Sequence, residues 1–358
     1  MNIKKRLRVA AIIPAHNEED TVEDAIRDLF NQTYPIDRII VVNDCSTDRT
    51  GEVLQKLQAQ IPQLRVFTNE IPALRAGAVN LGLKHLNAKE FDLVLTTDAD
   101  CRVDCKLVQE AIRSFEQTEL LGGVCSTAGV LPPKKIAVRP WWKRVERWLL
   151  WRLQRLEYAG FDAERTATWK NVLILHSLCS VYSLRAVKAV GAYTPNHLLE
   201  DYDLTLKLKE LGWQARFNPR MKAWTEVPTT FKALIRQRLR WLRGGVDIIL
   251  EHGINRLTAE DTLNHFLFVL LLLGVVLFVV LTARSGWHIK PHWHPIPLIL
   301  VAVGYLISLY KLRYIEDRNF IDVLLRVIVI PELIMAMVFS IVQVYAYYLA
   351  IGRRPQEW

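Results

Sequence analysis

The first part of the chain alternates short apolar runs with longer stretches of helical spacing. Four runs rich in β-branched residues predict strands: VAAII at 9–13, RIIVV at 38–42, LRVFT at 64–68 and DLVLTT at 92–97. The stretches near 18–31, 50–60, 75–87 and 105–116 predict helices. Strands that alternate with helices at this interval predict right-handed βαβ units around a parallel sheet, and thus an α/β fold.

Beyond Leu263 the apolar runs become long. The uncharged segment FLFVLLLLGVVLFVVLTA at 266–283 predicts a membrane span over about 265–283. Further spans are predicted over 296–310 and 333–352, separated by a helix over 321–330 that follows the membrane surface. Glu332 is interpreted either as solvated at the interface or as a functional group at membrane depth. The cluster KLRYIEDR after the second span places that loop on the cytosolic side.

Two basic amphipathic helices are predicted between these parts. WWKRVERWLLWRLQRLEY, at 141–158, puts an apolar stripe beside several charges, and TFKALIRQRLRWLRGG opens a second such helix over 231–262. Both patterns favour helices on a membrane surface, although a buried helix fits the first and a solvated basic face fits the second. We therefore divide the chain into a cytosolic domain over 1–230, an interfacial helix over 231–262 and a transmembrane region over 263–358.

Composition narrows the class of protein. Of the 358 residues, 51% are hydrophobic and 23% charged, which excludes a disordered or collagen-like chain. The net charge of +9 allows nucleic acid, an anionic membrane or a phosphorylated ligand as partner. Nucleic acid is disfavoured because the basic groups gather where the chain should meet lipid. The basic N-terminus has too short an apolar stretch for a signal peptide, so we expect it to stay in the cytosol.

Cysteine usage points to a reducing compartment. The five cysteines are odd in number and scattered, which argues against a disulfide framework. Cys101 and Cys105 stand four apart beside two aspartates, but no further Cys or His pair at ligand spacing is nearby. A zinc site is therefore disfavoured.

Polar motifs follow the predicted strands, at the sheet edge where open α/β folds bind ligands. They are PAHNE at 14–18, Asn43-Asp44 and Asp98-Ala99-Asp100. Each could simply cap a helix or form a turn. Asp98 and Asp100, two carboxylates that flank one small residue, could also present oxygen ligands to Mg²⁺ or Mn²⁺, and such a cation would neutralise a diphosphate. No G-x-G-x-x-G motif follows the first strand, so a dinucleotide is not indicated.

Two later motifs add candidate chemistry. Glu200 and Asp201 stand ahead of an amphipathic helix, where they either cap it or supply a general base for an attacking hydroxyl. Gln237, Arg240 and Trp241 share one side of the second basic helix, which offers an amide, a guanidinium for a diphosphate and an aromatic surface for a sugar ring.

Together these motifs resemble a known family. The set VAAIIPAHNEE, VVNDCSTD, TTDAD, LLEDYDLT and QRLRW, in this order and followed by spans, resembles the membrane-bound, processive-type members of glycosyltransferase family 2. These include cellulose, chitin and hyaluronan synthases, and the motifs are also similar to those of ceramide and glycolipid glucosyltransferases. The resemblance covers about residues 8–250. It implies an A-type nucleotide-sugar transferase (Rossmann-like) fold, a UDP-sugar donor, Mg²⁺ or Mn²⁺, and inversion at the sugar carbon.

The resemblance also assigns roles to residues. It implies that Ala15, Glu18 and Asp44 hold the uridine, that Asp98 and Asp100 hold the diphosphate with Asp100 acting through the metal, and that Asp201 is the base beside Glu200. Gln237 and Arg240 would close over the diphosphate, and Trp241 over the acceptor. Two positions depart from the family pattern: Asn43 replaces the first Asp of a D-D pair, and Arg75, in RAGAVN, stands at a basic donor-binding position.

The expected protein is an inverting transferase of the inner (plasma) membrane with its catalytic domain in the cytosol. Because three largely apolar spans make a poor polar tunnel, we expect a lipid or lipid-linked acceptor. A processive polysaccharide synthase is the alternative enzyme. A non-catalytic sugar-nucleotide-binding membrane protein is the alternative of another class. Membrane lipids are expected partners, and homo-oligomerisation is left open.

Overall fold

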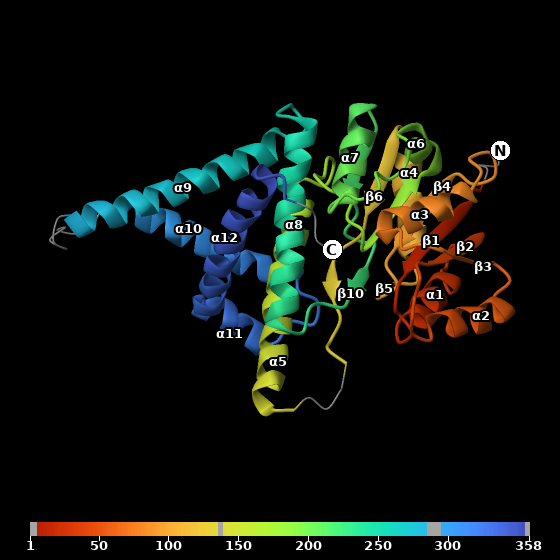
Figure 1. Ribbon diagram of the computed structural model, residues 1–358, viewed down its shortest axis with the longest axis horizontal. Helices are drawn as coiled ribbons and strands as arrows, with labels where there is room; N and C mark the ends of the chain where they lie inside the picture. The colour runs from red at the N-terminus through yellow and green to blue at the C-terminus, as the bar shows by residue number, and fades with distance from the viewer. Residues whose placement is uncertain (1–5, 135–138, 285–294, 355–358) are drawn as a thin grey trace.

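The computed structural model describes residues 6–134, 139–284 and 295–354. Figure 1 shows an α/β half built from the N-terminal part of the chain, two long helices beside it, and a group of C-terminal helices on the far side of those two. The loop at 285–294, which precedes the predicted second span, lies outside the described residues, as does Asn2.

A seven-stranded sheet forms the centre of the α/β half, in the order β3-β2-β1-β4-β8-β6-β9. Its strands are β1 (Val9–Ala15), β2 (Arg38–Asn43), β3 (Leu64–Thr68), β4 (Leu93–Thr97), β6 (Leu121–Cys125), β8 (Cys179–Ser183) and β9 (Gln214–Phe217). The predicted strands match β1 to β4, which are parallel. The sheet as a whole is mixed, because β8 runs antiparallel to both β4 and β6. The expectation of a purely parallel sheet is therefore wrong at β8.

Helices cover both faces of this sheet. They are α1 (Val22–Phe30), α2 (Thr50–Gln60), α3 (Leu74–Lys84), α4 (Leu107–Gln117), α6 (Leu184–Ala189) and α7 (Glu200–Glu210). The residues of β1 alternate between two cores: Val9, Ala11 and Ile13 pack with α1, α2 and α4, whereas Ala10 and Ile12 pack with α3, α6 and α7. Because β1 is buried on both faces, its sequence is an unbroken apolar run.

A small second sheet stands at the carboxyl edge of the large one. It contains β5 (Cys101–Val103), β7 (Gly129–Val130) and β10 (Ala223–Thr225), in the order β5-β10-β7. Asp98 and Asp100 occupy the short turn between β4 and β5. The two sheets therefore fix both ends of the segment that carries the predicted metal ligands.

Two long helices, α5 (Trp141–Ala167) and α8 (Phe231–His252), lie between the α/β half and the C-terminal helices (Figure 1). The predicted helix at 141–158 thus continues to Ala167. Trp141 and Trp142 are exposed, but Leu153 and Leu156 are buried in a cluster with α11 (Phe320–Ile328) and the 3₁₀ turn Leu312–Tyr314. Only the first turns of α5 offer the exposed surface expected of an interfacial helix.

The C-terminal helices are α9 (Ala259–Arg284), α10 (Pro295–Lys311), α11 (Phe320–Ile328) and α12 (Ile330–Ile351). Among the described helices, α9 and α12 are long and apolar enough to cross a membrane by length and composition. Only 6% of the most apolar window of α9 is buried, so α9 is not the core helix of a soluble domain. With 17 residues, α10 is at the lower limit for a span, and its bounds contain the predicted segment 296–310.

Candidate active site

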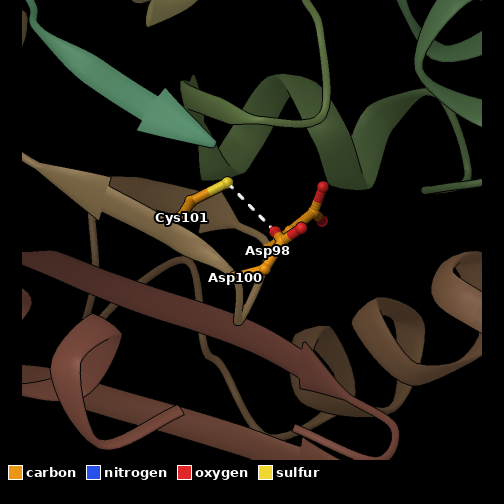
Figure 2. A group of neighbouring side chains, drawn as sticks. All are labelled: Asp98, Asp100 and Cys101. Atoms are coloured by element: carbon orange, nitrogen blue, oxygen red, sulfur yellow. Dashed lines mark hydrogen bonds between the residues drawn. The ribbon is translucent and has the colours of Figure 1, made fainter. Parts of the chain in front are cut away.

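The turn after β4 brings together an acidic cluster. One ligand atom each from Asp98, Asp100 and Cys101 lies within 4.8 Å of the others, and the Sγ of Cys101 is 3.4 Å from Oδ1 of Asp100 (Figure 2). Burial, together with the charges of Asp98 and Glu18, raises the pKa of Asp100 to about 7. Carboxylates crowded in this way favour a bound cation.

The donor set fits a hard divalent cation. Asp98 and Asp100 supply carboxylate oxygens, the ligands that Mg²⁺ and Mn²⁺ prefer. Burial and the charges of Asp100 and Asp98 raise the pKa of Cys101 well above its usual value, and a sulfur is a softer ligand than the oxygens that Mg²⁺ and Mn²⁺ prefer. Cys105 is exposed and stands outside this cluster. The cluster therefore fits the predicted magnesium or manganese site better than a zinc site.

Arg75, at the start of α3, connects this cluster to α7. Its Nε donates to Oδ1 of Asp98 at 2.6 Å, and its Nη1 donates to Oε1 of Glu200 at 3.0 Å. Its Nη2 donates to the carbonyl of Ser177 at 3.0 Å. One guanidinium thus ties the β4 edge to the first turn of α7, two segments that are far apart in the sequence. Because Glu200 is engaged in this ion pair, it is less suited than Asp201 to accept a proton.

Asp201 is a buried carboxylate held by two backbone amides. The N–H of Ser177 donates to its Oδ2 at 3.0 Å, and the N–H of Tyr202 donates to its Oδ1 at 2.9 Å. Burial and the neighbouring Glu200 raise the pKa of Asp201 to about 6. A carboxylate with such a pKa is ionised at neutral pH but retains enough basicity to accept a proton.

The predicted uridine contacts lie at the ends of β1 and β2. The carbonyl of Ala15 accepts from the N–H of Asp44 at 2.8 Å, which joins the two strand ends. Asp44 accepts from Nδ2 of Asn69 at 2.6 Å and from the N–H of Ala73 at 2.9 Å, so its carboxylate is fixed in place. Glu18 accepts from the hydroxyl of Thr21, and burial raises its pKa.

Sequence reasoning missed one charge in this region. Glu226, just after β10, raises the pKa of both Glu18 and Asp100 by its negative charge, and it pairs with Lys134 at 3.1 Å. The position of Glu226 in the sequence does not indicate that it lies near the acidic cluster, because β10 is brought there only by its pairing with β5.

The QRLRW motif of α8 packs beside the acidic cluster through the aromatic ring of Trp241. The ring of Trp241 lies 6.5 Å from that of Tyr158 and 6.4 Å from that of Phe161, both on α5. Tyr158 and Cys101 belong to the same buried cluster, against which Trp241 packs. Arg240 is exposed, and Oε1 of Gln237 accepts from Arg238. The structure thus places Trp241 against the α/β core and leaves the guanidinium of Arg240 at the surface.

Arg238 is a second residue that sequence reasoning missed. It is buried, its Nε donates to Oε1 of Glu157 at 3.0 Å, and its guanidinium carbon lies 4.2 Å from the centre of the Trp241 ring. Position 238 precedes Trp241 by one helical turn, and this spacing could have indicated the contact. Arg238 therefore holds Trp241 and joins α8 to α5.

Relatives with assigned names share part of this chain. It is 29% identical over 258 residues to the probable glycosyltransferase YdaM of Bacillus subtilis, a match that covers 70% of this chain and 58% of that protein. It is 26% identical over 253 residues to a poly-beta-1,6-N-acetyl-D-glucosamine synthase of Staphylococcus aureus, which covers 70% of this chain and 57% of the synthase. The chain thus matches less than two thirds of the length of these relatives.

A solved structure shares the fold across nearly the whole chain. The mannosyltransferase PcManGT from Pyrobaculum calidifontis, in complex with GDP-Man and Mn²⁺, superimposes with a TM-score of 0.62 at 17% identity. The superposition covers 98% of this chain and 89% of PcManGT. The fold is therefore of the A-type transferase class. The family model described as glycosyl transferase family 2 matches residues 10–191, and the chain is accordingly a glycosyltransferase of that family.

Proposed function

We propose that this protein is an inverting, metal-dependent membrane glycosyltransferase that moves a sugar from a UDP-sugar to a lipid or lipid-linked acceptor. The observation that carries the proposal is the bridge made by Arg75. This side chain joins Asp98, in the acidic cluster, to Glu200, the neighbour of Asp201. A cation site for a diphosphate and a carboxylate of raised pKa are thereby held in one site.

The mechanism follows from these positions. Asp201 accepts the proton of the acceptor hydroxyl as that oxygen attacks the sugar carbon, and the nucleoside diphosphate leaves from the opposite face. Asp100 and Asp98 would hold Mg²⁺ or Mn²⁺, which would supply positive charge for the diphosphate. Ala15, Glu18 and Asp44 line the uridine end, and Arg75 positions Asp98 and Glu200. We assign Gln237 and Arg240 of α8 to the donor and Trp241 to the acceptor, and the exposed guanidinium of Arg240 would have to turn toward the diphosphate when the donor binds.

The contacts of one loop support a proposal for the orientation in the membrane. Oε2 of Glu316, which follows α10 and the 3₁₀ turn, accepts from Nε1 of Trp224 at 2.9 Å, and Oε1 pairs with Lys222 at 2.9 Å. Both partners belong to the α/β half, so this loop lies on the same side of the membrane as the catalytic domain. We therefore propose that α9 and α10 form a hairpin that crosses the membrane and returns, with the catalytic domain in the cytosol.

The neighbour of α12 supports a proposal for its placement. α12 packs along α8, which carries seven charged side chains from Lys232 to Glu251. A helix with that many charges is too costly to place in hydrocarbon, so a helix beside it along much of its length lies at the same depth. We propose that α12, although long and apolar enough for a third span, lies along the membrane interface with one face in lipid.

A polysaccharide product is the second candidate, because one relative is named a poly-beta-1,6-N-acetyl-D-glucosamine synthase. Membranes that contain the protein should be supplied with radiolabelled UDP-sugars, and with GDP-mannose because PcManGT was solved with GDP-Man. Label in the chloroform-soluble fraction supports a lipid acceptor. Label in a long water-soluble chain supports the synthase, and label from GDP-mannose alone would contradict the UDP assignment.

A further inference from the structure

Tyr202, the residue after the proposed base, connects the α/β half to the first turn of α9. Its backbone N–H donates to Oδ1 of Asp201 at 2.9 Å, and its hydroxyl donates to Oδ2 of Asp261 at 3.2 Å. Asp261 belongs to the first turn of α9, a helix long and apolar enough to cross a membrane. One residue thus contacts the base through its main chain and a C-terminal helix through its side chain.

The main-chain contact determines where the carboxylate of Asp201 lies. Because α7 begins at Glu200, the N–H of Tyr202 is a first-turn donor without an acceptor inside the helix, and Asp201 supplies that acceptor. The other backbone donor to this carboxylate is the N–H of Ser177, at 3.0 Å. A shift of the first turn of α7 would therefore separate the carboxylate from one of these two donors.

The side chain of Tyr202 is fixed by burial and by one carboxylate. It is 1% exposed and belongs to a buried cluster with Leu206, on α7, and Ile248, on α8. Burial of a hydroxyl is unfavourable unless the hydroxyl makes a hydrogen bond. The position of the ring in this cluster therefore depends on the acceptor that Asp261 provides.

Asp261 is itself held by two helices. A carboxylate is favourable in the first turn of a helix, where the backbone N–H groups point outward. Its Oδ1 lies 3.8 Å from Nε2 of His265, one turn further along α9, and Nδ1 of His265 contacts the hydroxyl of Tyr347, on α12, at 2.7 Å. These contacts place Asp261 where α7, α9 and α12 meet.

We propose that Asp261 is a positioning residue for the base: through the hydroxyl of Tyr202 it fixes the first turn of α7, and thereby the carboxylate of Asp201. The inference rests on the proposed role of Asp201 and adds that the position of α9 controls the base. The acceptor hydroxyl must lie within hydrogen-bond reach of its base, and a misplacement of about 1 Å can slow a reaction about a hundredfold.

The first test measures hydrogen exchange by mass spectrometry on the full-length protein in lipid nanodiscs. Tyr202→Phe keeps the ring and removes the bond to Asp261. We expect the amide of Ser177, which is remote in sequence but donates to Asp201, to exchange at least about tenfold faster. Tyr345→Phe, the same change at an exposed residue of α12, is the matched control and should leave this exchange unchanged.

Two variants of similar size at position 261 give an independent comparison if Tyr202→Phe fails to fold. Asp261→Leu removes the acceptor, so it should speed exchange at Ser177 as Tyr202→Phe does. Asp261→Asn keeps an oxygen that accepts from the hydroxyl of Tyr202, so its exchange should stay near that of the wild type.

The second test measures kcat for each UDP-binding site, counted by calorimetry. Tyr202→Phe and Asp261→Leu should each lower kcat about tenfold with the KM for the donor unchanged, and Asp261→Asn should keep most of the activity. The double variant should be no slower than either single variant, because both changes remove the same bond. A role in stability alone would lower Tm and the number of binding sites but not kcat for each site.

Three results would overturn the positioning role: unchanged exchange at Ser177 in folded Tyr202→Phe and Asp261→Leu, additive effects of these two changes on kcat, or equal losses in Asp261→Asn and Asp261→Leu. Exchange can be measured whether or not sugar is transferred, so the two proposals are separable. Faster exchange in the variants of a protein that transfers no sugar refutes the function alone. Transfer by the wild type, with exchange and kcat unchanged in the variants, refutes the positioning role alone.

Discussion

At the scale of single residues, the site depends on how burial and neighbouring charge tune a few carboxylates. Asp201 and Asp100 both have raised pKa values, but their surroundings differ. Asp201 is fixed by two backbone N–H groups beside the Arg75–Glu200 pair, whereas Asp100 lies among the charges of Asp98, Glu18 and Glu226. The first environment suits a base that must be ionised and basic at once, and the second suits a cation ligand.

Replacing the proposed base should separate chemistry from binding. Asp201→Asn keeps the shape of the side chain but cannot accept a proton, so transfer should fall by about a hundredfold or more while UDP still binds. Transfer is measured with labelled donor and binding by calorimetry. Glu52→Gln, on the exposed face of α2, is the matched control. Transfer by Asp201→Asn at the wild-type rate would remove Asp201 from this role.

The rate of transfer should depend on pH through the same residue. Because the pKa of Asp201 is raised to about 6, the base gains its proton as the pH falls below that value. The value of kcat/KM should therefore fall about tenfold for each pH unit well below 6 and reach a plateau above it. A rate that stays constant down to pH 4.5, in a protein that remains folded, would contradict the assignment.

The acidic cluster predicts dependence on a divalent cation. EDTA should abolish transfer, and added Mg²⁺ or Mn²⁺ should restore it, because the crowded carboxylates Asp98 and Asp100 are placed to hold the ion. Asp100→Ala should lose activity at every metal concentration, whereas Asp104→Ala, outside the cluster, should respond as the wild type does. Full turnover in chelator would exclude the metal site.

At the scale of elements, the site depends on contacts that hold α7 and α8 together. His252, the last residue of α8, contacts Oδ1 of Asp203 through Nε2 at 3.0 Å and Oε1 of Glu210 through Nδ1 at 3.0 Å, both on α7. Burial alone would lower the pKa of His252, but these two bonds raise it overall. Lys207 shares Asp203, so the bridge is a small ionic network between the helix that carries Asp201 and the one that carries Trp241.

This bridge should make part of the stability of the protein depend on pH. A histidine whose pKa is higher in the folded state stabilises that state fully below pH 6.5 and loses this contribution as the pH rises through the raised value. The Tm of the wild type should therefore fall more than that of His252→Gln as the pH rises above 6.5. His197→Gln, whose histidine pairs with the more exposed Glu251, serves as the control. Parallel Tm curves for wild type and His252→Gln would contradict the bridge.

At the scale of the whole molecule, α5 and α8 form the layer between the α/β half and the C-terminal helices (Figure 1). The loop that contains Glu316 joins the segment after α10 to the α/β half through Trp224 and Lys222. In the proposed membrane arrangement the site lies beside the membrane surface, where a lipid acceptor and a water-soluble donor could both reach it.

Topology can be tested by the side on which single cysteines react. In the proposed arrangement, Arg284→Cys at the end of α9 reacts with an impermeant reagent from outside the cell, whereas Arg353→Cys, after α12, reacts only from the cytosolic side. Three spans would expose position 353 to the outside. Lys106→Cys in the catalytic domain gives the cytosolic reference, and external labelling at 353 would establish α12 as a third crossing.

The local pattern of the sequence determined much of the fold. The strands β1 to β4 and the helices around them follow from apolar periodicity, because a strand buried on both faces and an amphipathic helix each require a distinct spacing. The length of the uninterrupted apolar segments marked α9, α10 and α12. The acidic motif after the fourth predicted strand indicated Asp98 and Asp100 as candidates, since parallel strands end at one edge of a sheet. Asp201 was indicated by its place ahead of an amphipathic helix and by the family resemblance.

Tertiary structure alone decided how distant segments meet. The reversal of β8, the pairing of β10 with β5, the bridge from Arg75 to Asp98 and Glu200, and the packing of Arg238 on Glu157 and Trp241 all join residues that no local pattern relates. Only the folded chain shows that α12, whose apolar sequence is long enough for a span, packs along the charged helix α8. Periodicity states which face of an element is buried, whereas only the folded chain states what that face is buried against.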